Sequence, residues 1–301
     1  MLVSDRFGLD TPEEGLISFE VFVETQLYPL HTEREEEFKA LRRDVRSRFV
    51  LPGGPGEQLY PVFLDASKLL PDQEHVLFTS VLKLIQHLVE IEHKSKGEIE
   101  FSIVFRSFGS DFPHVIKDFN QFCRGEHPDF SEFKAPHLCI SPEQLGLSSR
   151  IGDRACDTCL IVTDQLDELP ASNTTLVPEK YETNRVIFGM EDISEFLKEH
   201  KVFAIRDQYR YWSKTGRERR GGKWIPLRDD TLVLFFDDGI APGDNLHNII
   251  DPRKIPSGEE INIVDLMDTT VFRVDTLQAI LNPNYYVELV DRALTSHGSK
   301  S

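Results

Sequence analysis

The chain has 301 residues, 40% of them apolar and 28% charged, so it can bury a substantial core as one large domain or two small ones. Asp and Glu number 51 against 34 Lys and Arg, which gives a formal charge of -17. Such an acidic surface repels phosphate backbones and anionic lipid headgroups, so the composition argues against nucleic acid and membrane surfaces as partners.

No targeting signal stands out in the sequence. No apolar run approaches the roughly 18 residues of a membrane span, and residues 1–10 lack the basic and apolar regions of a signal peptide. The four cysteines are too few for a dense disulfide framework in so long a chain. We therefore expect a cytoplasmic protein whose cysteines are free thiols.

The first third of the chain has the spacing of helices. Apolar residues recur at helical intervals from residue 17 to about residue 91, on one face over residues 59–70 and on another over residues 77–88. We expect residues 1–97 to form a helical, cap-like region.

Beyond Gly97, short apolar runs alternate with stretches of helical spacing, a pattern that predicts an α/β fold with a mostly parallel sheet. Two connecting helices have recognisable starts, at Pro113 in a first turn and at Asp275 with Gln278 in capping-box positions. We expect residues 98–301 to form the α/β core. The runs that we expect to be strands are residues 101–105, 160–163, 186–188, 202–205 and 232–236.

Polar residues follow the first of these strands. Ligands of open α/β sheets bind beyond the carboxyl ends of the strands, so these positions matter most. Ser107 and Gly109 place a hydroxyl and a turn ahead of a helix, an arrangement that can hold an anionic oxygen. The same residues also suit an ordinary turn between a strand and a helix.

Two adjacent carboxylates, Asp237 and Asp238, follow the last run, which has the composition of a central strand buried on both faces. Oxygen ligands of this kind suit Mg²⁺, although a solvated turn can begin in the same way. Between the two strand ends, Lys223 follows a pair of glycines. It can neutralise a phosphate, or it is one more cation of a solvated basic loop that begins near Lys214.

Taken in order, Ser107, Lys223 and the pair Asp237-Asp238 resemble motifs two, three and four of the haloacid-dehalogenase-like (HAD-like) superfamily. The resemblance covers roughly residues 98–294. It implies a three-layer, Rossmann-like, mostly parallel sheet with a helical insertion near the N-terminus. It also implies Mg²⁺ as cofactor, held by Asp237 and Asp238, and a small phosphorylated ligand bound by Ser107 and Lys223.

The first motif of that superfamily supplies an Asp that attacks phosphorus, with a second Asp two positions later that protonates the leaving group. Asp65 is the candidate nucleophile in this chain, but Ser67 stands at the second position and the surrounding apolar residues have helical spacing. Two hypotheses stay open: a Mg²⁺-dependent, phosphatase-like hydrolase, and a non-catalytic binding or scaffold protein with a phosphorylated ligand or another protein as its partner.

Three other features carry weaker signals. Cys156 and Cys159 form a CxxC pair, but no second pair of zinc ligands stands at a suitable spacing, so we interpret them as ordinary thiols. His247 lies near the Asp pair in sequence and is more typical of a structural or solvated loop residue. Trp212, with the tyrosines just before it, can either stack on a ligand or cover the sheet.

Overall fold

The computed structural model describes residues 19–29, 32–70, 75–150, 154, 157–166, 181 and 184–298. The chain divides into two compact units, a smaller one of Met1–Leu70 with Val274–Tyr285 and a larger one of Pro71–Arg273 with Tyr286–Ser301. The division therefore differs from the predicted boundary at residue 97. Helix α4 (Thr79–Lys94) belongs to the larger unit because its Leu82 and Ile85 are buried in that unit's core.

The described part of the smaller unit is helical, as the spacing of apolar residues predicted. Helix α2 begins with three glutamates, and its buried Arg42 donates to the carbonyl oxygen of Tyr28 at 2.9 Å and pairs with Glu35. Asp275 caps helix α9 by accepting the N–H of Gln278 at 3.0 Å, which confirms the predicted helix start. The elements are α1 (Phe19–Phe22), a π-helical turn (Val23–Leu27), α2 (Glu35–Ser47), a 3-10 turn (Glu57–Leu59), α3 (Tyr60–Leu69) and α9 (Thr276–Leu281).

The larger unit contains a five-stranded mixed sheet in the order β1-β5-β2-β3-β4. Strands β1, β5 and β2 are parallel, whereas β3 runs antiparallel to both of its neighbours. Two separate parallel pairs, β6 with β8 and β7 with β9, complete the described strands. The α/β class is thus confirmed, and the main sheet is mixed because two of its pairings are antiparallel. The strands are β1 (Ile103–Ser107), β2 (Leu145–Arg150), β3 (Thr158–Val162), β4 (Arg185–Phe188), β5 (Val202–Arg206), β6 (Lys223–Leu227), β7 (Phe235–Asp237), β8 (Ile250–Lys254) and β9 (Val271–Arg273).

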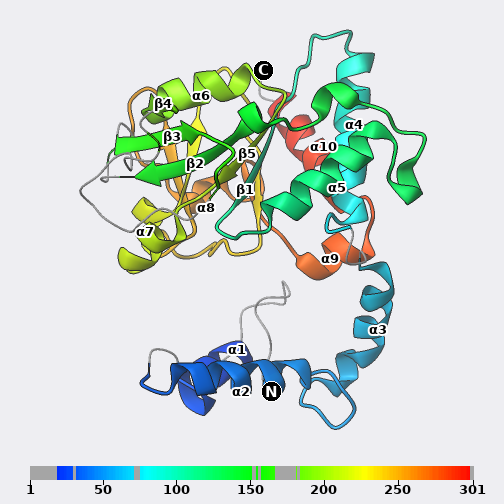
Figure 1. Ribbon diagram of the computed structural model, residues 1–301, viewed down its shortest axis with the longest axis vertical. Helices are drawn as coiled ribbons and strands as arrows, with labels where there is room; N and C mark the ends of the chain where they lie inside the picture. Colours follow the sequence, from blue (N-terminus) through cyan, green and yellow to red (C-terminus); the bar gives the residue numbers. More distant parts are fainter. Residues whose placement is uncertain are drawn as a thin grey trace. The chain divides into compact units, whose positions relative to one another are not determined.

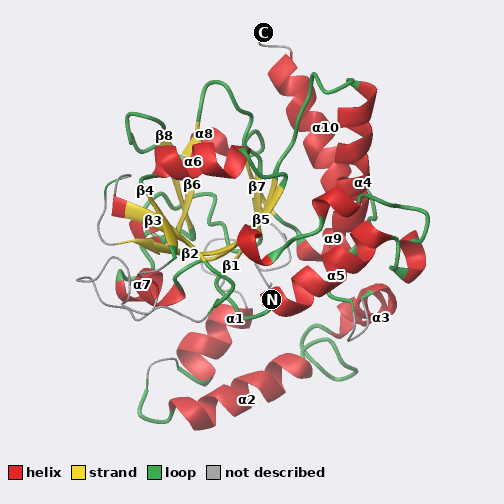
Figure 2. Cartoon of the chain, turned by 45° about the horizontal axis from the view of Figure 1, so that its top comes forward, coloured by secondary structure: helices red, strands yellow, loops and turns green. Residues whose placement is uncertain are grey.

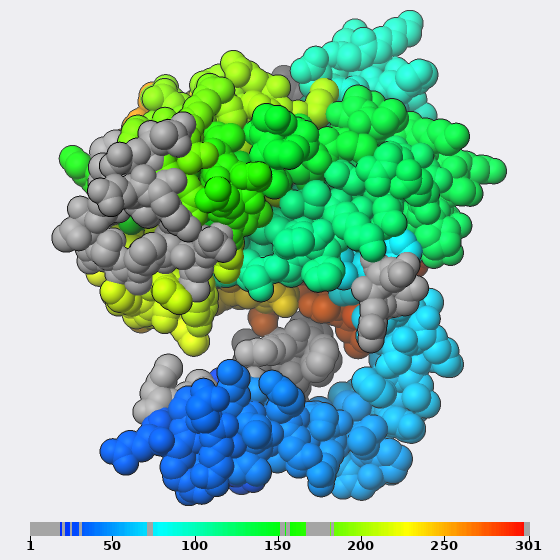
Figure 3. All heavy atoms as spheres, viewed as in Figure 1, coloured from blue at the N-terminus to red at the C-terminus, as the bar shows by residue number. Residues whose placement is uncertain are grey.

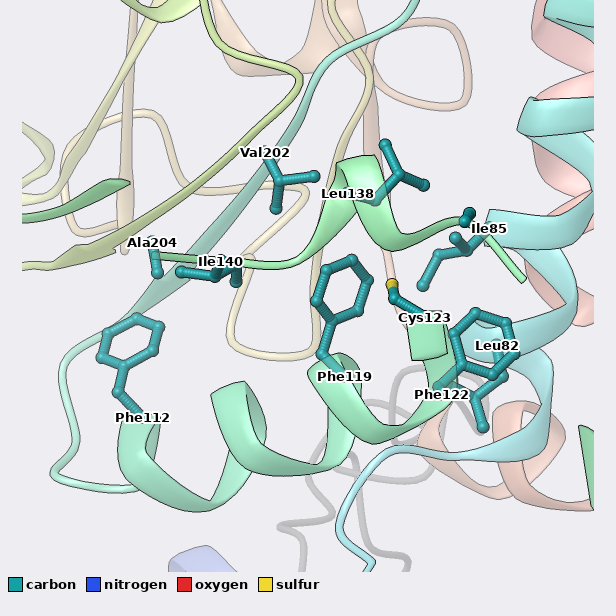
Figure 4. Close-up of a cluster of buried hydrophobic side chains, with 11 residues drawn as sticks. Leu82, Ile85, Phe112, Phe119, Phe122, Cys123, Leu138, Ile140, Val202 and Ala204 are labelled. Carbon is teal, nitrogen blue, oxygen red and sulfur yellow. The ribbon is translucent and has the colours of Figure 1, made fainter. Parts of the chain in front are cut away.

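Helices cover both faces of this sheet (Figure 1). Successive residues of β5 point to opposite sides: Ala204 joins the core cluster of α4 and α5 (Phe112–Arg124), and Phe203 joins that of α6 (Met190–Lys198). Figure 4 shows Phe112 and Phe119 of α5 projecting towards the sheet, and Phe122 lying beside Leu82 of α4. Pro113 lies in the first turn of α5, as predicted. In the space-filling view of Figure 3, the segment coloured teal to green, about residues 101–150, forms much of the visible surface of the larger unit.

The C-terminal helix α10 (Tyr285–Gly298) lies beside α4 in both views of the chain (Figures 1 and 2). Nε2 of His87 on α4 lies 2.7 Å from Oδ1 of Asp291 on α10, and this contact joins the two helices. The remaining short helices are α7 (Tyr209–Lys214) and α8 (Ile263–Leu266). No helix in the described part of the chain is long and apolar enough to cross a membrane.

A cluster of charges connects β2 to β8 inside the larger unit. Asp251 of β8 is fully buried, and its carboxylate receives Nη1 of Arg150 at 2.7 Å and Nε of Arg253 at 3.1 Å. Arg219 approaches the same carboxylate at 3.5 Å. Because each of the three arginines is at most 5% exposed, Asp251 is the buried countercharge that makes their burial tolerable.

Candidate functional site

Lys223 and Asp237 form a buried ion pair. Lys223 is the first residue of β6 and Asp237 the last of β7, and Nζ donates to Oδ2 at 2.7 Å. The two side chains are only 7% and 9% exposed. The reading of Lys223 as one more cation of a solvated loop is therefore wrong, because the lysine begins a strand and its ammonium is paired inside the protein.

Ser107 ends β1, as predicted, and its hydroxyl is part of the following turn. Oγ donates to Oδ1 of Asp111 at 2.9 Å and accepts the N–H of Gly109 at 2.9 Å. The next residue, Phe108, places its ring 5.1 Å from Nζ of Lys223. The structure thus brings the carboxyl end of β1 next to the Lys223–Asp237 pair, which comes from strands much later in the sequence.

Aromatic side chains surround the ring of Phe108. Trp212 of α7 stacks on it with centroids 5.3 Å apart and an interplanar angle of 13°. Tyr209 meets the same ring edge-on at 5.8 Å. Nε1 of Trp212 donates to the carbonyl oxygen of Asn248 at 2.8 Å, which fixes the indole. Phe108, which lies beside Lys223, is thus held in an aromatic cluster with Tyr209 and Trp212.

The two predicted metal ligands have different surroundings. Oδ1 of Asp237 accepts the N–H of Gly239 at 2.8 Å, so each of its oxygens already has a donor. A carboxylate oxygen has two lone pairs, and Asp237 therefore keeps some capacity to accept a cation. Asp238 is exposed. Strand β7 is half-buried and pairs with β9, so the expectation of a strand buried on both faces is wrong.

His247 is held by Asp244 in a turn that follows the Asp pair in sequence. Its N–H and that of Leu246 each donate to Oδ1 of Asp244 at 2.8 Å, and these bonds hold the pKa of Asp244 below its usual value. The imidazole is 54% exposed, with Nδ1 3.6 Å from Oδ2 of Asp244. These contacts fit the interpretation of His247 as a solvated loop residue.

An aspartate does follow the strand beside β1, at a position that the sequence pattern did not single out. Strand β5 ends at Arg206, and Asp207 comes next with 3% exposure. Its carboxylate accepts Nε of Arg106 at 3.0 Å and also pairs with Nη2 of the same guanidinium. Arg106 in turn donates to the carbonyl oxygen of Trp224, beside Lys223. The charge of Asp207 is therefore neutralised by Arg106. In the sequence, the apolar run at residues 202–205 was the feature that could have drawn attention to Asp207.

Asp65, the candidate nucleophile, lies on helix α3 in the smaller unit. The helix predicted from the apolar spacing is confirmed. The carboxylate is 68% exposed and pairs with Nζ of Lys68 at 2.8 Å. A first-motif Asp is expected at the end of a strand, and Asp65 does not stand at such a position.

The three described cysteines, Cys123, Cys139 and Cys159, form no disulfide with one another. Cys159 is fully buried in β3, and burial raises the pKa of its thiol to about 11. A thiol in that state is a poor nucleophile and a poor metal ligand. Cys156, its partner in the CxxC pair, lies outside the described residues.

Comparisons with known proteins returned nothing: no family model matches the chain, and neither does any curated protein or solved structure. The side chains at the carboxyl ends of β1 and β7 and at the start of β6 are therefore the basis for a functional proposal.

Proposed function

We propose that the larger unit is a HAD-like domain that binds Mg²⁺ and a phosphorylated ligand where β1 and β7 end. The observation that carries the proposal is the buried pair of Lys223 and Asp237 next to Phe108. An ammonium is costly to bury unless it is paired. Lys223 begins β6, but its ammonium lies beside the carboxyl ends of β1 and β7, and it is at such strand ends that α/β proteins bind ligands.

The charges at these strand ends suit a cation and an anion together. The carboxylates of Asp237 and Asp238 and the ammonium of Lys223 leave one negative charge. A divalent cation on the carboxylates reverses that sign, and the site then attracts a phosphate in spite of the acidic surface. When bound, Mg²⁺ would screen the charge of the phosphate. Lys223 would compensate more of that charge, and the Ser107 hydroxyl, which donates to Asp111 in this structure, would turn to donate to a phosphate oxygen instead.

The surroundings of Asp65 and Asp207 favour ligand binding without hydrolysis. Asp65 is exposed on a helix and paired with Lys68, and Asp207 is neutralised by Arg106. A nucleophilic carboxylate needs a free oxygen directed at the phosphorus atom. Neither of these two groups meets that requirement, so we place phosphatase activity second and binding first.

Thermal unfolding of the full chain, with and without Mg²⁺ and inorganic phosphate, tests the binding function. Ligands that bind only the folded state raise Tm. We expect Mg²⁺ to raise Tm of the wild type and of the control Asp229→Asn, whose carboxylate is 90% exposed, but not of Asp238→Asn or Asp237→Asn. A wild type without a Mg²⁺ shift, or an Asp238→Asn variant that keeps the shift, would contradict the metal assignment.

Hydrolysis of a generic aryl phosphate separates binding from catalysis. Asp65→Ala removes only an exposed carboxylate, so the variant should fold normally. Turnover that disappears in Asp65→Ala would establish the phosphatase and overturn the preference for binding alone. Turnover that persists would assign catalysis to another nucleophile. If Mg²⁺ binds and there is no turnover in either protein, the binding function stands.

A further inference from the structure

Three side chains from separate segments of the larger unit, none of them part of the site proposed above, lie close together. His75 precedes α4, Asp118 lies in α5 and His127 follows that helix. One ligand atom of each lies within 4.8 Å of the others. We call these residues the His–Asp–His cluster. The exposed fraction is 14% for the His75 side chain, nil for Asp118 and 5% for His127.

The carboxylate of Asp118 holds the cluster in place. Oδ2 accepts the N–H groups of Val76 and Leu77, each at 2.8 Å, and Oδ1 lies 2.7 Å from Nδ1 of His75. These bonds fix the segment before α4 against α5, so the cluster exists in the folded chain without a ligand. A pre-formed site of this kind requires little ordering when an ion binds.

Apolar rings surround the second imidazole. The His127 ring lies 5.3 Å from that of Phe130 and 6.5 Å from that of Phe122, and it approaches the His75 ring to 4.4 Å. Phe122 belongs to the core cluster drawn in Figure 4. Two imidazoles and one carboxylate are thus gathered where water is largely excluded, and the partly exposed edge of His75 is the route by which an ion could enter.

We propose that the His–Asp–His cluster binds one divalent transition-metal ion of the Zn²⁺ type. Two imidazoles with one carboxylate are a donor set for such ions, whereas Mg²⁺ prefers oxygen ligands alone. Zinc bonds are about 2.1 Å long. Three ligand atoms no more than 4.8 Å apart lie at most about 2.8 Å from a common centre, so each side chain has to move by less than about 1 Å to bind one ion.

Zinc titration of the EDTA-dialysed full chain against a competing chromophoric chelator tests this site. We expect one tightly bound equivalent in the wild type and a rise in Tm on binding. His127→Gln leaves the bonds of Asp118 intact and should lower the affinity by on the order of 100-fold, since even supporting residues of metal sites cost 10–100-fold. The matched control is His137→Gln, which removes an exposed imidazole of the same unit.

Cobalt(II) in place of zinc identifies the ligand atoms. We expect ligand-field absorption without a sulfur-to-metal charge-transfer band, because the cluster contains no thiolate. A thiolate band, zinc affinity retained in the His75→Gln/His127→Gln double variant, or no zinc binding by the wild type would each overturn the proposal. Metal-free Tm values near that of the wild type show that a variant is folded. None of these outcomes depends on Mg²⁺ binding at Asp237 and Asp238.

Discussion

Nζ of Lys223 lies 2.7 Å from Oδ2 of Asp237, and both groups are largely removed from water. The pair joins the start of β6 to the end of β7, two strands that belong to different small sheets. Removing one member of a buried pair leaves the other as an uncompensated charge, and the cost exceeds what the intact pair contributes.

Lys223→Met should therefore lower the free energy of unfolding by about 3 kcal/mol. The double variant Lys223→Met/Asp237→Leu should recover most of that loss, because no charge then remains buried. Urea denaturation of both single variants and the double variant gives the coupling energy. Lys254→Met is the control, since that ammonium is 47% exposed and should cost little. Equal losses in Lys223→Met and Lys254→Met would show that the pair is not effectively buried.

Lys223→Met should also raise the affinity of the site for Mg²⁺ and lower its affinity for phosphate. The ammonium competes with a cation for Asp237, and unit charges this close interact by several kcal/mol even at an effective dielectric constant of about 20. We expect Mg²⁺ to bind at least ~10-fold more tightly to the variant and inorganic phosphate to bind more weakly. Titrations followed by calorimetry measure both. Unchanged Mg²⁺ affinity would mean that the cation does not use Asp237.

The elements that the sequence revealed are those in which apolar spacing alone decides the structure. The runs at residues 202–205 and 186–188 became β5 and β4, and helical spacing located α3 and α4. Strands β2 and β8 were missed because they contain Arg150 and Asp251, whose charges are buried against each other. No periodicity shows that a charged residue has its partner in a strand about a hundred positions away.

Among the candidate site residues, too, some were recognisable from the sequence and others only from the structure. Residue types and their order singled out Ser107, Lys223 and Asp237 as candidates, and in the structure Lys223 and Asp237 form an ion pair. The local bonds that occupy Ser107 depend on turn geometry, which a motif does not specify. The His–Asp–His cluster gave no signal at all. His75 and Asp118 are 43 positions apart in the sequence, and only tertiary packing brings them together.

The described cysteines should differ sharply in reactivity. Cys123 is fully buried, and burial, with Cys139 nearby, raises the pKa of its thiol to about 12, so almost no thiolate forms near neutral pH. We expect a maleimide at about pH 8 to label Cys139, which is partly exposed, and to spare Cys123 and Cys159 until denaturant is added. Peptide mass spectrometry reports each position separately. Labelling of native Cys123 as fast as that of Cys139 would contradict the burial.

Asp251 should be costly to neutralise. Its single negative charge serves Arg150, Arg219 and Arg253, all buried. Nε and Nη2 of Arg150 are buried without a hydrogen-bond partner, so this cluster already has an excess of donors. Asp251→Asn keeps the shape of the side chain but leaves three cations around a neutral amide.

We therefore expect Asp251→Asn to lower the free energy of unfolding by about 3–5 kcal/mol, the range found when one partner of a buried pair is removed. Glu260→Gln is the matched control: Glu260 lies 3.1 Å from Arg253 and 3.8 Å from Arg219, but its side chain is 57% exposed. Solvent screens this carboxylate, so its loss should cost less than about 1 kcal/mol. Chemical denaturation of both variants decides the point. If the two losses were equal, the arginines would be stabilised mainly from the surface, and Asp251 would not be the countercharge that allows their burial.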